Sequence, residues 1–111
     1  MKPEHYIQNQ IREWCGSHGY LAFRCNVGKV LTANNVYFDT GLPSGFSDLL
    51  ILDSSGHAIF CEVKTATGRQ RPDQLAFQKT VTERGFIYIL ARSVSDVEKV
   101  LTKTVKTVND I

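Results

Sequence analysis

The sequence predicts an α/β fold in which a mixed central sheet is flanked by helices, with the elements in the order α-β-β-β-α-β-α. Apolar residues recur at helical spacing near both ends of the chain. Two nearly continuous apolar runs between them are typical of strands that are covered on both faces. With 111 residues, 42% of them hydrophobic and 22% charged, the chain fits one compact domain over residues 1–111.

The first half of the chain is expected to contain a helix, a strand and a long irregular segment. Apolar side chains at helical spacing predict a helix over residues 3–18, which begins at a proline. Aromatic and apolar residues predict a strand over 20–27. Glycine, proline and asparagine then interrupt the pattern over 28–47, with a short strand around 36–38. A loop of this length in a small domain favours a functional role or mobility.

The middle of the chain predicts a β-hairpin. Residues 48–53 form an apolar run bounded by aspartates, and Asp53-Ser-Ser-Gly56 has the composition of a turn. Residues 57–64 then provide the returning strand. The two strands are therefore expected to pair with each other.

The last third predicts a helix, a strand and a second helix. A proline opens the first helix over 72–84 and a glycine closes it. Residues 86–91 form a buried strand, and Ser95-x-x-Glu98 has the form of a capping box for a helix to about residue 105. Because a helix separates the hairpin from the 86–91 strand, we expect a right-handed parallel crossover between them.

Charge and cysteine content set broad limits on function. The net charge of +2 permits a nucleic-acid partner but does not demand one. Cys15, Cys25 and Cys61 form no CxxC pair, which favours free thiols in a reducing compartment. The N-terminal residues lack the apolar segment of a signal peptide, and no apolar run is long enough to cross a bilayer. We therefore predict a soluble, cytoplasmic protein.

Glu62, Lys64 and Asp48 are the residues with the clearest chemical pattern. Glu62 and Lys64 are two residues apart on a predicted strand, so their side chains leave the same face about 6–7 Å apart along the backbone. Such charged groups are costly to bury on a central strand unless they meet partners or a metal. The hairpin turn brings Asp48 beside Glu62. Two converging carboxylates predict an oxygen site for Mg²⁺ or Mn²⁺.

This set of groups suits phosphodiester hydrolysis. A metal between Asp48 and Glu62 can lower the pKa of a bound water and polarise a phosphoryl oxygen. The Lys64 ammonium can orient the nucleophile or stabilise charge that builds on the phosphate. The alternative is an exposed Glu62–Lys64 ion pair on an edge strand, because an isolated Glu-x-Lys triplet is common. The position of Asp48, between a glycine-rich loop and an apolar strand, favours catalysis.

Three segments together resemble a known superfamily. Gly45-Phe-Ser-Asp48-Leu-Leu, a hairpin, and then Phe60-Cys-Glu62-Val-Lys64-Thr are similar to the PD-(D/E)XK nucleases, which implies a restriction-endonuclease-like fold. The continuation Gly68-Arg-Gln-Arg-Pro-Asp-Gln74 resembles the VRR-NUC branch, the virus-type replication-repair nucleases. That branch contains stand-alone phage proteins and domains of larger DNA repair enzymes. The resemblance covers most of the chain, from Glu4 to the last strand.

The resemblance implies a role for each matching residue. It makes Asp48, Glu62 and the backbone carbonyl of Val63 metal ligands for Mg²⁺ or Mn²⁺, and it makes Lys64 the catalytic lysine. Gln74 corresponds to a glutamine on the following helix that supports the site, and Glu4 to an acidic residue of the first helix. Periodicity agrees that Gln74 is a polar residue on an inward helical stripe, although a satisfied core amide would give the same pattern.

Glu4 has a second interpretation, and one position departs from the family pattern. A glutamate in the first turn of a helix is favourable against the helix dipole wherever it points. The usual proline before the aspartate is Ser47 here, which leaves the ligands in place and makes the local geometry less certain.

The sequence offers several candidate contacts to nucleic acid. Tyr37 and Phe38, in the long loop, stack on bases or fill the core, and we favour the core. The histidines show no common spacing. Five basic residues bracket the proposed site and are candidates for phosphate binding: Arg24, Lys29, Arg69, Arg71 and Lys79.

The resemblance implies a metal-dependent endonuclease that hydrolyses DNA. Stand-alone members act on branched DNA and resemble Holliday-junction resolvases, and a homodimer would present two active sites to a four-way junction. The implied location is the cytoplasm of a phage-infected or other bacterial cell. Three alternatives remain: a non-catalytic nucleic-acid-binding module of a phage replication or repair complex, an RNA-directed nuclease of the same fold, and a structural subunit in which Glu62 and Lys64 merely pair.

Overall fold

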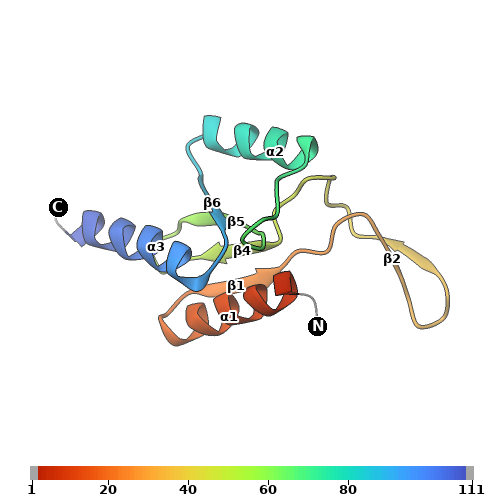
Figure 1. The fold of residues 1–111 in the computed structure, drawn as a ribbon, viewed down its shortest axis with the longest axis horizontal. Coiled ribbons are helices and arrows are strands. Elements are labelled where there is room, and N and C mark those ends of the chain that lie inside the picture. Colours follow the sequence, from red (N-terminus) through yellow and green to blue (C-terminus); the bar gives the residue numbers. More distant parts are fainter. Residues whose placement is uncertain (1–2, 110–111) are drawn as a thin grey trace.

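A computed structural model of the chain describes residues 3–109 and contains three helices and six strands in this part of the chain (Figure 1). No helix among these residues is long and apolar enough to span a membrane. In chain order the elements are α1 (Pro3–Ser17), β1 (Leu21–Arg24), β2 (Lys29–Leu31), β3 (Tyr37–Asp39), β4 (Leu49–Leu52), β5 (Ala58–Val63), α2 (Pro72–Glu83), β6 (Ile87–Ala91) and α3 (Val94–Asn109).

Four strands form one mixed sheet in the order β1-β4-β5-β6. β4 pairs antiparallel with both β1 and β5, and β5 pairs parallel with β6 across the helix α2. In the β4–β5 hairpin Leu49 lies opposite Cys61. The expected mixed α/β fold, the hairpin and the parallel β5–α2–β6 unit are therefore confirmed.

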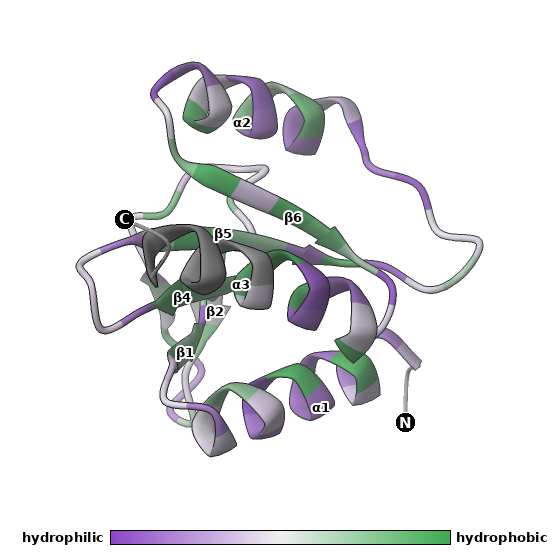
Figure 2. Cartoon of the chain, turned by 90° about the vertical axis from the view of Figure 1, so that its left-hand side faces the viewer, coloured by the Kyte–Doolittle hydropathy of each residue, from purple (hydrophilic) through white to green (hydrophobic). Residues whose placement is uncertain are grey.

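One face of the sheet carries the hydrophobic core. Alternate residues of β4, β5 and β6 point to this face and are almost fully buried, as the two-residue period of a strand requires. α1 and α3 cover them, and Figure 2 shows hydrophobic residues concentrated along these strands. The core cluster consists of Ile11, Cys15, Leu49, Ile51, Ile59, Cys61, Val63, Ile89, Ala91, Val97 and Leu101.

The opposite face of the sheet is only partly covered. α2 packs over β5 and β6 through ring contacts of Phe77 with Phe60 and Tyr88, at centroid distances of 5.4 and 6.5 Å. On this face, no helix among residues 3–109 covers β1 in the same way, and Phe23 remains 49% exposed. The residues of β4 therefore alternate between buried and half-buried. The expectation that residues 48–53 are covered on both faces is wrong for this face.

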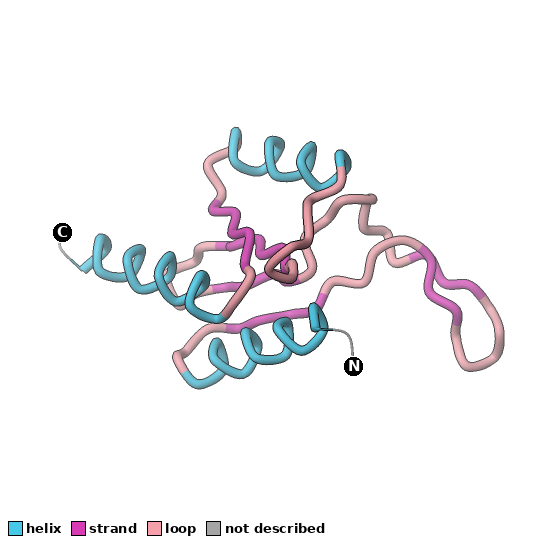
Figure 3. The backbone as a smooth tube through the Cα atoms, viewed as in Figure 1, coloured by secondary structure: helices cyan, strands magenta, loops and turns pink. Residues whose placement is uncertain are grey.

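The segment between β1 and β4 forms a second, two-stranded sheet from β2 and β3. We call residues 28–40 the arm. Its base is closed by a hydrogen bond from Thr40 N–H to the Gly28 carbonyl (2.9 Å), and its tip by one from Thr32 N–H to the Val36 carbonyl (2.8 Å). Figures 1 and 3 show the arm extending away from the main sheet, along the 52 Å long axis of the molecule. The sequence indicated a strand only around 36–38 and missed β2.

Two further expectations need correction. Tyr37 and Phe38, which we expected in the core, are 69% and 61% exposed, because the arm does not pack on the main sheet. The last helix begins at Val94 rather than after Ser95. The Asp96 carboxylate accepts a hydrogen bond from Arg92 N–H (2.9 Å), so the acidic residue at the cap is Asp96, two residues before the Glu98 of the expected box.

Candidate active site

The β4–β5 hairpin brings Asp48, Glu62 and Lys64 together at one end of the sheet. Asp48 directly precedes β4, and the pairing of Leu49 with Cys61 places it across from Glu62 near the end of β5. Asp48 Oδ2 accepts a hydrogen bond of 2.8 Å from Val63 N–H, which fixes the carboxylate against β5. The sequence prediction that Asp48 lies beside Glu62 agrees with this geometry.

Glu62 is buried with incomplete compensation of its charge. Its side chain is 1% exposed, and Lys64 Nζ lies 3.6 Å from Glu62 Oε2. The pKa of Glu62 is raised to about 8. Burial is the largest cause and the nearby Asp48 charge is the second, whereas the Lys64 charge opposes the rise. Lys64 is itself 7% exposed, so the alternative of an exposed ion pair on an edge strand is excluded.

Gln74 connects this carboxylate to the beginning of α2. Its Nε2 donates a hydrogen bond of 2.7 Å to Glu62 Oε2, and its Oε1 accepts one of 2.9 Å from Arg71 N–H. The same side chain therefore caps the helix and holds the glutamate, which explains why a glutamine is 4% exposed in this position. Gln74 therefore fits both interpretations: it is a buried amide with hydrogen-bond partners, and it contacts the candidate site residue Glu62.

The loop before Asp48 is held against α2 by contacts that the sequence did not predict. Gly45 has φ +88°, and a Cβ atom at this position would lie 2.2 Å from the Asp73 carbonyl oxygen. Ser44 Oγ donates a 2.5 Å hydrogen bond to Asp73 Oδ2, and this bond is the main reason that the pKa of Asp73 lies below its ordinary value. In the sequence this glycine is a loop breaker within the resembled Gly45-Phe-Ser-Asp48 motif, and a glycine so near a candidate site aspartate is a signal for close backbone approach.

Ser47, where the resembled family usually has proline, is fully buried. Its Oγ donates a hydrogen bond of 3.0 Å to the Leu49 carbonyl. The serine thus shapes the backbone beside Asp48 by a hydrogen bond, and the aspartate itself is retained.

A pocket of about 260 Å³ opens beside Asp48. Glu4 of α1 and Arg71 and Gln74 at the start of α2 line it together with Asp48, so four of the predicted site residues share one cavity. Cys25, one of three free thiols, is also in its wall. Glu4 is half-buried and lines the pocket.

The predicted phosphate-binding residues are spread more widely. Arg71 lines the pocket, and its Nε lies 3.3 Å from Asp73 Oδ1. Lys79 is directed to solvent on α2, with its side chain 78% exposed and 4.0 Å from Glu83 Oε1. Arg24, Lys29 and Arg69 are exposed, and within residues 3–109 they form no ion pair.

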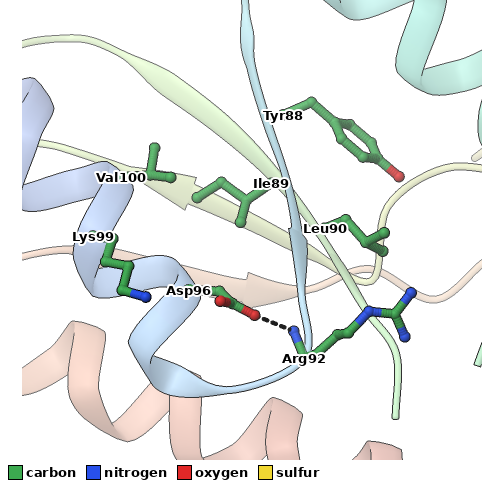
Figure 4. Close-up of a pocket in the computed structure, with 7 residues that line it drawn as sticks. All are labelled: Tyr88, Ile89, Leu90, Arg92, Asp96, Lys99 and Val100. Carbon is green, nitrogen blue, oxygen red and sulfur yellow. Dashed lines mark hydrogen bonds between the residues drawn. The ribbon is translucent and has the colours of Figure 1, made fainter. Parts of the chain in front are cut away.

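The turn after Lys64 is held by Arg92, which sequence reasoning missed. Arg92 Nη1 donates hydrogen bonds to the carbonyls of Thr65 and Gly68, at 2.5 and 2.7 Å. Figure 4 shows Arg92 in a second pocket of about 510 Å³, along the outer edge of β6 and the start of α3. This pocket is larger than the one at Asp48. However, it contains no pair of carboxylates, so its size does not make it the better candidate for chemistry.

The buried Glu62 carboxylate and the half-buried Asp48 carboxylate fit a divalent cation. Glu62 Oε1 is the one buried side-chain oxygen or nitrogen among the described residues that has no hydrogen-bond partner. A cation would satisfy this oxygen and offset the repulsion between Glu62 and Asp48. No group of three histidine, cysteine, aspartate or glutamate side chains in the described part of the chain is placed to hold a metal. The donor set is therefore two carboxylates completed by backbone, water or substrate oxygens, which suits Mg²⁺.

Comparison with solved structures identifies the fold. A chain described as a VRR_NUC domain superposes with a TM-score of 0.71 and 23% sequence identity, covering 92% of this chain and 97% of that chain. The chain has the fold of a VRR_NUC domain. No protein-family model matches the sequence, and no curated protein matches it with significance. The VRR_NUC likeness spans both the sheet that carries Asp48 and Glu62 and the helices around it.

Proposed function

We propose that this VRR_NUC-like domain is a divalent-metal-dependent endonuclease that hydrolyses DNA phosphodiester bonds. The observation that carries the proposal is the buried Glu62 beside the half-buried Asp48, in which Glu62 Oε1 has no protein partner and Lys64 lies 3.6 Å from Oε2. A structural ion pair would not require a second carboxylate beside it, because like charges raise the cost of burial.

The chain's own residues have distinct roles in this proposal. Asp48 and Glu62 hold the cation, with the Val63 carbonyl as a third oxygen. Lys64 orients the attacking water or stabilises negative charge on the phosphate, and its stem is fixed by burial. Gln74 keeps Glu62 in place by its 2.7 Å hydrogen bond. Bound Mg²⁺ or Mn²⁺ would polarise the phosphoryl oxygen and lower the pKa of water.

Glu4 and the basic residues extend the proposed site. Glu4 shares the pocket with Asp48. In this proposal its carboxylate contacts a second cation or the attacking water. Arg71 stands at the pocket wall and binds the scissile or adjacent phosphate. Arg24, Lys29, Arg69 and Lys79 remain candidates for more distant phosphates.

The finer part of the proposal concerns the substrate and the working unit. We propose activity on branched DNA, such as a Holliday junction, by a homodimer in the cytoplasm of a bacterial or phage-infected cell, with a role in DNA repair. The support is the VRR_NUC-like fold together with the two-fold symmetry of a four-way junction.

A cleavage assay tests the proposal. The folded protein is incubated with a four-way junction, a flap, linear duplex, single-stranded DNA and single-stranded RNA, in Mg²⁺, Mn²⁺ or EDTA. Glu62→Ala is the inactive variant, and Glu83→Ala is the matched control, because Glu83 is an exposed glutamate (62%) on α2. We expect metal-dependent cutting of DNA that is lost in Glu62→Ala and retained in Glu83→Ala.

Other outcomes decide between the alternatives. If folded protein cuts RNA alone, the RNA-directed nuclease replaces the DNA nuclease. If it binds DNA without cutting it in either metal, the chain is a binding module. A thermal unfolding series with Mn²⁺ adds an independent measurement, because a ligand that binds only the folded state raises the melting temperature. That increase should be absent in Glu62→Ala.

A further inference from the structure

The arm exposes an unusual amount of apolar surface. Tyr37 is 69% exposed, Phe38 61%, Val36 59% and Leu31 51%. Large apolar side chains gathered on one protruding element mark a contact surface more often than chance exposure. A two-stranded hairpin is only marginally stable alone in water, so a partner that covers these side chains would also stabilise the arm.

The apolar side chains lie on both faces of the arm. Leu31 and Tyr37 are cross-strand partners and share one face, whereas Phe38, the next residue, points to the other. Both aromatic rings are more than 60% exposed. A flat protein surface would cover one face and leave the other ring in water. Coverage of both faces requires an occupant into which the arm inserts.

The charge of the arm excludes phosphates as its main contact. Its charged residues are Lys29 and Asp39, which are cross-strand partners at its base, so the arm has no net charge and Lys29 is a candidate phosphate contact at the base alone. The tip, over 31–37, carries no charge. The arm is therefore suited to the faces of aromatic groups rather than to the backbone of a nucleic acid.

The arm begins at the wall of the candidate active site. Cys25, Asn26 and Val27, which connect β1 to the arm, line the same pocket as Asp48. The chain returns from the arm to Gly45 and Phe46, which also line that pocket. A ligand that contacts the arm would thus be adjacent to a ligand at the carboxylate site.

We propose that the arm is a base-stacking element, which inserts Tyr37 and Phe38 among unpaired bases next to the bond that is cut. This inference rests on the proposed nuclease function and adds a second contact to it. Bases that have left a duplex present two apolar faces and are held by stacking on aromatic side chains, while apolar wedges enter where base steps open. Paired bases inside an intact duplex offer no such faces, so the arm would distinguish DNA with unpaired bases from linear duplex.

Binding measurements in a Glu62→Gln background, which keeps the DNA uncut, test the proposal. The probes are a duplex with a gap that carries 2-aminopurine, the corresponding linear duplex and a single strand. Replacing Tyr37 and Phe38 by serine should weaken binding to the gapped and single-stranded probes by roughly tenfold or more and change duplex binding less than twofold. The change in 2-aminopurine fluorescence on binding should be lost.

Two further variants separate stacking from general hydrophobic contact. Tyr37→Phe with Phe38→Tyr keeps both rings and should bind as the parent does, whereas Tyr37→Leu with Phe38→Leu keeps apolar surface without rings and should lose most of the effect. Leu21→Ser is the control, since Leu21 is 60% exposed at the other end of β1.

The remaining outcomes overturn the proposal in distinguishable ways. If the serine variant binds every probe as the parent does, the arm is not a base contact, and the nuclease proposal is untouched. If it becomes monomeric while the parent is dimeric and loses affinity equally for all probes, the arm docks on a second copy. If the parent binds no nucleic acid, the nuclease proposal and the arm proposal fail together.

Discussion

Gln74 and Glu62 are joined by a buried hydrogen bond of 2.7 Å between the amide nitrogen and carboxylate Oε2. The other end of the same amide accepts a hydrogen bond from Arg71 N–H, so the first turn of α2 and the last part of β5 share one side chain. Neither group can move without breaking a bond of the other. The position of the proposed metal ligand is therefore coupled to the beginning of the helix.

Gln74→Leu should break this coupling. Leucine fills a similar volume but leaves Arg71 N–H without its cap and Glu62 Oε2 without its donor. We expect a loss in the free energy of unfolding on the order of 1–3 kcal/mol, together with a reduced affinity for Mn²⁺. Urea denaturation and Mn²⁺-dependent thermal shifts measure the two effects. Gln78→Leu on the same helix is the control, and a loss of Mn²⁺ affinity as large as that of Gln74→Leu would contradict the coupling.

Glu62→Gln should abolish cleavage and stabilise the metal-free protein. At neutral pH the folded state of the wild type contains either a buried charge or a proton that the unfolded chain would not hold. Replacing the carboxylate by an amide removes the repulsion with Asp48 as well as the attraction to Lys64. Because burial and Asp48 raise the pKa of Glu62 by more than Lys64 lowers it, we expect a net gain on the order of 1–3 kcal/mol at pH 8 in EDTA. Thermal unfolding in EDTA measures this gain. A melting temperature equal to or below that of the wild type would show that the Glu62 carboxylate does not destabilise the metal-free protein.

The pH dependence of stability tests the same residue without mutation. The pKa of Glu62 rises from 4.5 to about 8 on folding, so between these values the folded state binds more protons than the unfolded state. In EDTA, the contribution of Glu62 to the free energy of unfolding is therefore fully present below pH 4.5 and is lost as pH rises through 8. Denaturation curves at a series of pH values should show this slope in the wild type and a flatter profile in Glu62→Gln. Equal slopes in the wild type and Glu62→Gln would show that a group other than Glu62 causes the pH dependence.

The sequence predicted the sheet and the carboxylate site because their determinants are local. Alternation in β4 and β5 and the short turn between them set the register that places Asp48 opposite Glu62. The contacts of Arg92 and of Gly45 join segments that are far apart in the chain, so no periodic pattern reports them. The exposure of Tyr37 was missed for a related reason. An aromatic residue on a strand has the same sequence pattern whether or not another layer covers it.

Gly45→Ala should destabilise the protein more than the same substitution at a glycine that has a positive φ and open space around it. The new methyl group would lie 2.2 Å from the Asp73 carbonyl oxygen, in addition to the strain of φ +88°. Gly56→Ala is the matched control, because Gly56 has φ +87° and nothing within 4 Å of a Cβ position. We expect Gly45→Ala to lose at least about 1–3 kcal/mol more than the control. Equal losses in urea denaturation would show that the loop before Asp48 can move away from α2.

Arg92→Lys should loosen the turn between Lys64 and α2 while it preserves the charge. Lysine cannot reproduce the guanidinium hydrogen bonds to the carbonyls of Thr65 and Gly68. Trypsin should then cut after Arg69 several times faster under native conditions, because local opening exposes the turn.

The matched control for this turn is Arg84→Lys. Arg84 Nη1 also donates to a backbone carbonyl, that of Thr80 at 2.9 Å, but within α2. Limited proteolysis followed by mass spectrometry locates the cuts in both variants. If Arg92→Lys and Arg84→Lys are cut after Arg69 at the wild-type rate, the Arg92 contacts do not hold the turn. Faster cutting in Arg92→Lys alone would show that the arginine at the end of β6 sets the position of the segment that carries Arg69 and Arg71 toward the proposed DNA-binding surface.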